Sequence, residues 1–412
     1  MKKAFIVLCA IAVVSTGAFA QKKGKKETKQ EEGYSFTIKK ELPVTPVKNQ
    51  HRAGTCWCYS GLGFIEAELL RMGKGEYDFS EMYLVHKTYD DRAMAAIRTS
   101  GDVSFSQGGA FNDVIYGMKH YGLVPEEVMR PGVMYGDSLS DHSELSALTD
   151  VMVAAIAKND KLKTLQRNSN GEMLCKKAIS AVHDVYLGVC PERFTYKGVE
   201  YTPESFYKST GLNADDYVSI TSYTHHPFYE RFVLEIQDNW RWGLSYNVPI
   251  DEMMEILDNA IENGYPVAWG SDVSEQGFRM GVRKGFCVLP ATDGKNVATM
   301  GSDMSHWTGL SAQAMQDEAA KHPTPQRWVS QEERQAAYDN RETTDDHGMV
   351  IYGTATDQMG NEYYMVKNSW GDYGDYHGMF YASKAFVRYK TMNYVVHKDA
   401  IPQNIKDKLG IK

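Results

Sequence analysis

Cysteine, histidine and asparagine stand, in that order, in short segments whose side chains could perform nucleophilic chemistry together. In the first segment, QHRAGTCW (50–57), Cys56 opens a predicted helix. A thiol at a helix N-terminus lies at the positive end of the dipole, which favours the attacking thiolate. Gln50 carries an amide N–H that could bind an oxyanion together with the backbone N–H of Cys56. The alternative for this segment is a structural cysteine beside a core tryptophan.

The histidine and the asparagine lie at the ends of two successive predicted strands. His347 stands in TDDHGMV (344–350) and Asn368 in KNSWG (367–371). An antiparallel pair would bring the two side chains together, so Asn368 could accept the imidazole N–H and fix the ring. Trp370 could cover that hydrogen bond from water. A lone histidine is more often structural, but the order Cys, His, Asn with these flanks is hard to obtain by chance.

Hydrophobic periodicity predicts helices in the first part of the chain and strands in the last. The helices are predicted at 56–71, 111–121, 144–158, 172–187 and 249–262, and the strands at 266–270, 349–354, 362–367 and 379–382. Gly61 and Gly63 each cost about 1 kcal/mol relative to Ala inside a helix, which suggests close packing there. A site between the two parts would lie in a cleft.

Composition and charge exclude several classes of function. The chain has 412 residues, 42% of them hydrophobic, and a formal net charge of −8. A mildly acidic protein has no electrostatic reason to bind nucleic acid or an anionic membrane. Cys175, Cys190 and Cys287 lack metal-site spacing, and His225-His226-Pro227 has no accompanying ligand motif, so we expect no metal and no cofactor.

The N-terminus has the pattern of a secretory signal peptide over residues 1–20. Lys2 and Lys3 precede an apolar run at 5–14, and Ala18-Phe19-Ala20 is a cleavage motif. The run is shorter than the ~20 residues that span a bilayer. We therefore expect export to the periplasm or the exterior without stable membrane insertion, a retained anchor being the alternative. Residues 21–33 are polar and charged and indicate a disordered leader.

Export bears on the remaining cysteines, because an oxidising compartment favours disulfides. Removal of the first twenty residues leaves an odd number of cysteines, so at least one is free or pairs with another chain. The sequence leaves open whether any of the five forms a disulfide; they are Cys56, Cys58, Cys175, Cys190 and Cys287.

These motifs resemble those of papain-like cysteine peptidases. The resemblance implies Cys56 as nucleophile, His347 as base, Asn368 as the orienting residue and Gln50 in the oxyanion hole. Ala53 stands where the papain signature has its first cysteine, so the disulfide from that position is absent. The implied fold is α+β, with a helical part and an antiparallel β part.

The spacing narrows the resemblance to the bleomycin hydrolase and aminopeptidase C group. Papain has its histidine roughly 130–150 residues after the cysteine, and His347 lies about twice as far from Cys56. We therefore predict a large, mostly helical insertion at about 140–330 within a peptidase domain spanning 34–398. SQGGAF (106–111), YGLVP (121–125), NVPIDE (247–252) and RETT (341–344) also match this group.

The resemblance carries further expectations about binding and assembly. Gly108 and Gly109 would expose backbone groups that hydrogen-bond an extended peptide. The tail, 399–412, would enter the cleft, where the carboxylate of Lys412 would receive the substrate amine. The group forms hexamers, so a homo-oligomer is expected. The implied function is a cysteine aminopeptidase acting on peptides; an endopeptidase of the same fold and a cysteine-dependent amidase remain alternatives.

Overall fold

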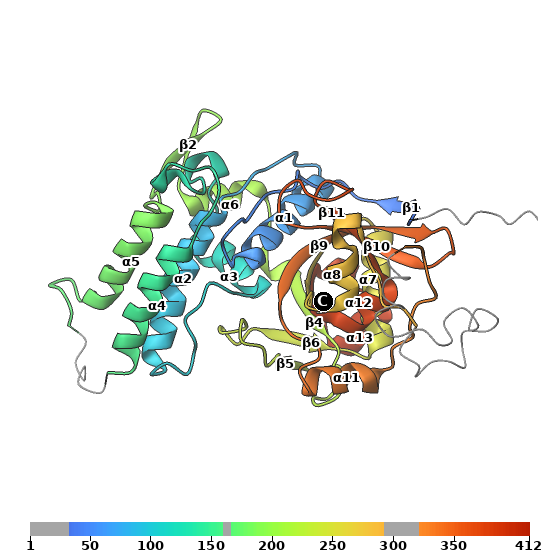
Figure 1. Ribbon diagram of the computed structural model, residues 1–412. Coiled ribbons are helices and arrows are strands. Elements are labelled where there is room, and N and C mark those ends of the chain that lie inside the picture. Colours follow the sequence, from blue (N-terminus) through green and yellow to red (C-terminus); the bar gives the residue numbers. More distant parts are fainter. Residues whose placement is uncertain (1–32, 160–165, 292–320) are drawn as a thin grey trace, which may run out of the picture. The chain divides into compact units, whose positions relative to one another are not determined.

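A mixed β-sheet forms the framework of the second half of the chain (Figure 1). The computed structural model describes residues 33–159, 166–291 and 321–412; the predicted signal peptide and all but Gly33 of the predicted leader lie outside them. In the main sheet the strand order is β5-β6-β4-β12-β7-β9-β10-β11-β8, and β1 also pairs with β9. Its strands are β1 (Phe36–Glu41), β4 (Tyr217–Thr221), β5 (Arg231–Val233), β6 (Leu244–Asn247), β7 (Val267–Ser271), β8 (Phe286–Cys287), β9 (His347–Asp357), β10 (Glu362–Lys367), β11 (Met379–Ser383) and β12 (Thr391–His397).

The three strands predicted near the C-terminus form the antiparallel centre of this sheet. β9 pairs with β10, and β10 with β11, both antiparallel. Val350 lies opposite Lys367 in the first pair. The start of β9 and the end of β10 therefore meet at the same edge, which is where His347 and Asn368 stand.

Helices fill the first part of the chain and cover the sheet. The bounds are α1 (Cys56–Arg71), α2 (Glu81–Arg98), α3 (Phe111–Tyr121), α4 (Ser143–Ala157), α5 (Leu174–Leu187), α6 (Pro203–Thr210), α7 (Ile250–Glu262), α8 (Gln276–Gly281), α11 (Gln331–Asp339), α12 (Lys384–Lys390) and α13 (Gln403–Leu409). Helix α1 packs on β9, whereas α2, α4 and α5 pack on one another away from the sheet (Figure 1). A short hairpin, β2 (Phe194–Tyr196) and β3 (Val199–Tyr201), lies beside α6.

Helix α1 approaches its neighbours closely where the sequence has glycine. A Cβ atom at position 61 would lie 2.6 Å from Cγ2 of Val114 in α3, so a side chain cannot fit without movement. At position 63 the nearest atom would be Nζ of Lys367, at an ordinary 3.6 Å. The close packing predicted for this helix is thus present at Gly61 but absent at Gly63.

The range 140–330 does not form one helical insertion. α4, α5 and α6 come from this range, but so do β4 and β7, which flank β12 in the main sheet. The short apolar run 266–270 had the pattern of a buried strand, and the structure places it at the centre of the fold as β7. Besides its helices, which also include α7 and α8, the range therefore contributes strands to the main sheet.

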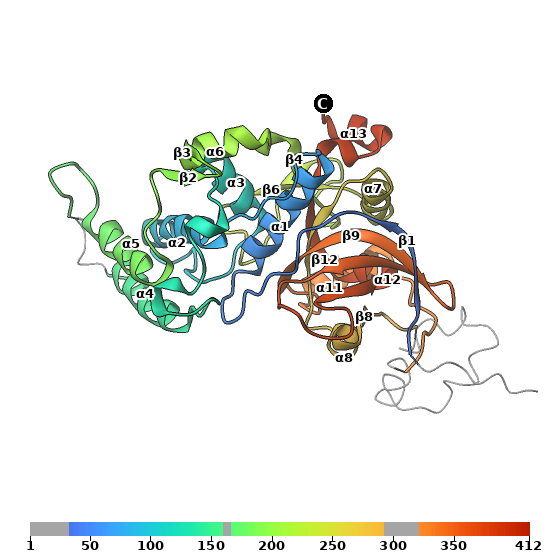
Figure 2. The ribbon, with the colours of Figure 1, turned by 90° about the horizontal axis from the view of Figure 1, so that it is seen from above.

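The C-terminal tail differs from the expectation. It forms α13, which lies beside α7 (Figure 2), and Ile405 and Leu409 are buried in the same core cluster as the apolar residues of α7. Nδ2 of Asn259 in α7 donates to the carbonyl of Ala400 at 2.7 Å. Pro402 immediately precedes α13, where its missing N–H leaves no hydrogen bond of the helix unmade.

A search of the described residues finds no helix of the length and apolar character that crossing a membrane requires.

Candidate active site

The N-terminus of α1 holds Cys56 beside the β9–β10 edge. The segment before the helix runs along the loop after β10: the N–H of Gln50 donates to the carbonyl of Ser369 at 2.9 Å, and the N–H of Gly371 donates to that of Lys48 at 3.0 Å. These backbone bonds fix the position of Gln50 and of the turn into α1. Cys56 is partly exposed and its thiol is free.

His347 and Asn368 are joined as the sequence predicts. Nε2 of His347 lies 2.7 Å from Oδ1 of Asn368, and both residues are buried. Which atom donates follows from a second contact, because the backbone N–H of Ser369 also points at Oδ1, at 2.8 Å. A backbone N–H can only donate, so this atom is the amide oxygen and Nε2 must carry a proton. In the neutral ring Nδ1 then keeps its lone pair and can act as a base.

Aromatic rings cover this pair. The ring of Trp370 lies over that of His347, with centroids 4.8 Å apart. The hydroxyl of Tyr373 accepts from Nδ2 of Asn368 at 2.9 Å, which also fixes the amide orientation. Trp370 is thus placed as a cover for the His347–Asn368 hydrogen bond.

Gln50 reaches the same region through its side chain. Its Nε2 donates to the carbonyl of Ala53 at 2.8 Å, and its Oε1 accepts from the hydroxyl of Ser369 at 2.8 Å. An amide nitrogen carries two hydrogens, so one remains to donate to an oxyanion. The second donor of the predicted pair, the backbone N–H of Cys56, belongs to the first turn of α1, where N–H groups have no partner within the helix.

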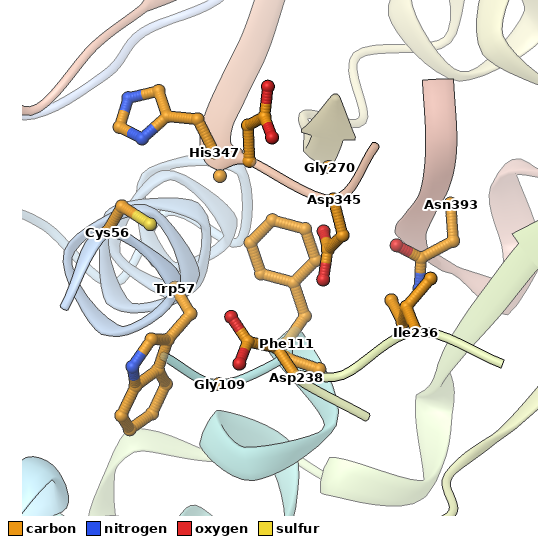
Figure 3. Close-up of a pocket in the computed structure, with 13 residues that line it drawn as sticks. Cys56, Trp57, Gly109, Phe111, Ile236, Asp238, Gly270, Asp345, His347 and Asn393 are labelled. Atoms are coloured by element: carbon orange, nitrogen blue, oxygen red, sulfur yellow. The ribbon is translucent and has the colours of Figure 1, made fainter. Parts of the chain in front are cut away.

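Cys56 and His347 line one cavity (Figure 3). It encloses about 370 Å³ of empty space, part of it open to solvent. The cysteine and the histidine come from opposite layers, α1 and β9. The remaining wall consists of Trp57, Gly109, Ala110, Phe111, Ile236, Asp238, Gly270, Asp345, Asp346, Gly348 and Asn393.

Burial favours the uncharged forms of both reacting groups. Burial raises the pKa of the Cys56 thiol to about 11, opposed by the backbone N–H groups of Gly348 and Trp57 and reinforced by Asp345 and Asp238. Burial also lowers the pKa of His347 to about 4, against the opposing hydrogen bond to Asn368. The helix dipole at Cys56 and burial in the cavity thus act on the thiol pKa in opposite directions.

The two glycines predicted to bind substrate are already engaged. The carbonyl of Gly108 accepts from Nη1 of Arg92 at 2.5 Å, and the N–H of Gly109 donates to the carboxylate of Asp238. Gly109 lines the cavity and packs under Trp57, since a Cβ atom there would lie 2.8 Å from Cε2 of the indole. Thus the N–H expected to bind the substrate backbone is held by the protein itself.

Lys412 does not reach this cavity. Burial of Ile405 and Leu409 anchors α13 on the core beside α7, and the N–H of Ile411 donates to the carbonyl of Lys406 at 3.1 Å. The cavity is lined instead by Asp238 and Asp345, which sequence reasoning missed. Asp345 stands two residues before His347 and was within reach of a motif argument; Asp238 lies in a loop with no recognisable pattern.

Two groups of side chains among the described residues have the ligand types and proximity to hold a metal ion: His86 with Asp90 and His183, and His225 with His226 and Glu235. In the second group both imidazoles lie 3.0 Å from oxygens of Glu235, so hydrogen bonds account for this cluster as it stands. Neither group lies among the residues that line the cavity of Cys56.

Comparisons with known proteins agree with this geometry. The profile of the Peptidase C1-like family matches residues 3–411. Aminopeptidase C of Streptococcus thermophilus is 25% identical over 90% of this chain and 85% of its own, and Aminopeptidase G of Lactobacillus delbrueckii subsp. lactis is 23% identical over 90% and 85%. The crystal structure of PepW from Lactobacillus rhamnosis covers 91% of this chain and 84% of its own, with a TM-score of 0.66 at 21% identity. The chain belongs to the peptidase C1-like family and is a papain-like cysteine peptidase.

Proposed function

We propose that the protein is a cysteine aminopeptidase that removes residues from the N-termini of peptides. The observation that carries this proposal is the hydrogen bond between His347 and Asn368, which leaves Nδ1 basic in the cavity that holds the Cys56 thiol. Relatives at 22–25% identity that carry the name aminopeptidase support the exopeptidase assignment.

The mechanism follows from the protonation states of the pair. The thiol proton passes to Nδ1 of His347, and the thiolate attacks the substrate carbonyl carbon. Gln50 and the backbone N–H of Cys56 donate to the resulting oxyanion. The imidazolium then protonates the leaving amine, which gives a thioester, and water activated by the neutral imidazole hydrolyses it. Asn368 holds the ring in position throughout.

The first test is removal of the nucleophile. Cys56→Ala should abolish hydrolysis while thermal unfolding stays unchanged, because a partly exposed thiol contributes little to the core. An epoxysuccinyl inhibitor such as E-64 should label wild-type protein stoichiometrically, and mass spectrometry should place the label on Cys56. Turnover by purified Cys56→Ala would exclude this residue as nucleophile.

A mass-spectrometric digest of a peptide library separates the alternatives. An aminopeptidase shortens every peptide from its N-terminus and leaves N-acetylated peptides intact. Internal cleavage would indicate an endopeptidase of the same fold. Release of a non-peptide amine, with all peptides intact, would indicate a cysteine-dependent amidase.

Assembly and location are part of the proposal. The resemblance to the bleomycin hydrolase group supports a homo-oligomer, with the hexamer of that group as the expected form, and sedimentation as a monomer at micromolar concentration would contradict it. The signal-peptide pattern of residues 1–20 supports export to the periplasm or the exterior. Protein sequencing of the mature N-terminus after cell fractionation tests that location.

A further inference from the structure

One carboxylate in the cavity of Cys56 has no compensating partner. Asp345 makes no hydrogen bond or ion pair with any residue that the structure describes, and its side chain points into the cavity (Figure 3). Its neighbour Asp346 is different, because it accepts from the backbone N–H groups of Val273 and Ser274 at 3.1 and 2.9 Å. A half-buried carboxylate without a partner is less stable than a paired one, and a cation from outside would supply that partner.

A loop closes the cavity next to Asp345. Ile236 and Asp238, between β5 and β6, line the cavity together with Cys56. The loop is braced internally, since Nδ2 of Asn239 donates to the carbonyls of Leu234 and Gly243, both at 3.0 Å. Asp238 also lies 3.4 Å from Nη1 of the fully buried Arg92, so this second carboxylate is compensated.

The loop places Asp238 against the backbone of Gly108, where an extended peptide is expected to pair. Asp238 holds the N–H of Gly109, and a Cβ atom at Gly108 would lie 2.1 Å from Oδ2 of Asp238. A substrate strand cannot pair with this backbone while Asp238 is there. The part of a substrate on the N-terminal side of the cleaved bond must therefore be short, and its first residue must lie close to the loop.

The chain's own C-terminus supplies no negative charge here, because α13 is anchored on the core beside α7. We propose that Asp345 is the receptor for the α-ammonium group of the substrate, with the Ile236–Asp238 loop as the wall that stops longer chains. Asp345 thereby selects peptides by their free N-terminus and sets which bond reaches Cys56. This inference rests on the proposed peptidase activity and names its specificity residue.

The electrostatics of the site agree with a cationic ligand. Burial, together with the charges of Asp238 and Asp346, raises the pKa of Asp345 to about 7. An ammonium group at Asp345 would favour its ionised form. It would also offset the negative charges that disfavour the Cys56 thiolate.

The test compares wild-type protein with Asp345→Asn on four fluorogenic aminomethylcoumarin amides: those of alanine, N-acetylalanine, lysine and N-acetyllysine. A charge-assisted hydrogen bond of this kind corresponds to about 10- to 100-fold in kcat/KM. In Asp345→Asn, kcat/KM on the alanine and lysine amides should fall by that factor. The wild-type preference for free over acetylated amines should then disappear. Asp345→Ser serves as a second variant if the first does not fold.

Asp339→Asn is the matched control. This substitution removes one carboxylate from a neighbouring cavity, which is lined by Asp345 but not by Cys56. It should leave the preference for free over acetylated amines unchanged. E-64 labelling of Cys56 counts competent sites in every variant, so rates refer to active protein.

Three outcomes overturn the inference. The first is a preference for free amines that persists in both Asp345 variants. The second is an equal loss on free and acetylated substrates. The third is a dependence on Asp345 for N-acetyllysine, which would assign the carboxylate to a side-chain ammonium. Failure of the proposed function itself is distinguishable, because wild-type protein would then hydrolyse none of the four amides and Cys56 would not be labelled.

Discussion

The orientation of the catalytic ring depends on one backbone group, the N–H of Ser369. It fixes which end of the Asn368 amide faces His347 and, through that, which imidazole nitrogen is basic. Asn368→Ala should therefore lower kcat by about 10- to 100-fold, the usual effect of losing an orienting partner. His347→Ala, which removes the base itself, should cost more. Steady-state kinetics on one substrate measures both, and an Asn368→Ala loss as large as that of His347→Ala would mean that Asn368 does more than orient.

The thiol of Cys56 should respond to the charge of Asp345. Asp345 and Asp238 both raise the pKa of the Cys56 thiol, so removing one negative charge should lower it. In Asp345→Asn the midpoint of the pH profile for alkylation by iodoacetamide should move to lower pH than in wild type. Mass spectrometry of the peptide containing Cys56 follows this thiol separately from the other cysteines. An unchanged midpoint would show that Asp345 does not act electrostatically on the nucleophile.

At the scale of elements, α13 has a structural role. Ile405 is fully buried in the core cluster that includes α7, so Ile405→Ala should lower the free energy of unfolding by about 2–5 kcal/mol. The ratio of aminopeptidase to endopeptidase rates should stay unchanged, because α13 is anchored away from the cavity. Lys412→Ala, at an exposed position, is the control and should change neither quantity. Urea unfolding measures the free energy of unfolding, and peptide digests measure the ratio of aminopeptidase to endopeptidase rates. A changed ratio in Lys412→Ala would contradict this prediction and indicate that the tail lies in the cleft.

The elements that the sequence predicted well are marked by apolar residues within the segment itself. Helix α1 and strand β10 have the predicted bounds, because both are rich in apolar residues and are buried over nearly their whole length. Helix α2 was missed: its buried face includes His86, Thr88 and Arg92, polar residues that become buried through partners distant in sequence. Local patterns carry no information about such partners.

The same reason limited the prediction of the site. Cys56, His347 and Asn368 could be found because each lies in a recognisable segment and two strands join the last two. Asp238 could not, because its place in the cavity depends on Arg92 and Gly109, both far away in sequence. Asp345 was visible beside His347, but only the structure shows that it has no partner within the described ranges of the chain.

At the scale of the whole molecule, the helical layer should be sensitive to acid. Burial lowers the pKa of His142 to about 4 and also lowers that of His86. The unfolded chain binds these protons below about pH 6.5, whereas the folded protein does not bind that of His142 until about pH 4. The stability contributed by the neutral histidines is thus present above pH 6.5 and is lost as the pH falls towards 4.

Urea unfolding at several pH values between 7.5 and 4.5 measures this loss. Within that window His142 should contribute a slope of up to about 1.4 kcal/mol per pH unit. His142→Gln should remove this part of the slope, since glutamine does not titrate. A pH dependence identical in wild type and variant would show that His142 does not limit stability in acid.

The raised pKa of the Cys56 thiol also bears on the chemical durability of the protein. Peroxides oxidise the thiolate and not the thiol, so burial of Cys56 should slow its oxidation between turnovers. Inactivation by hydrogen peroxide should therefore be slow in wild-type protein and faster in Asp345→Asn. A carboxylate that selects the substrate would in this way also preserve the sulfur in an oxidising environment.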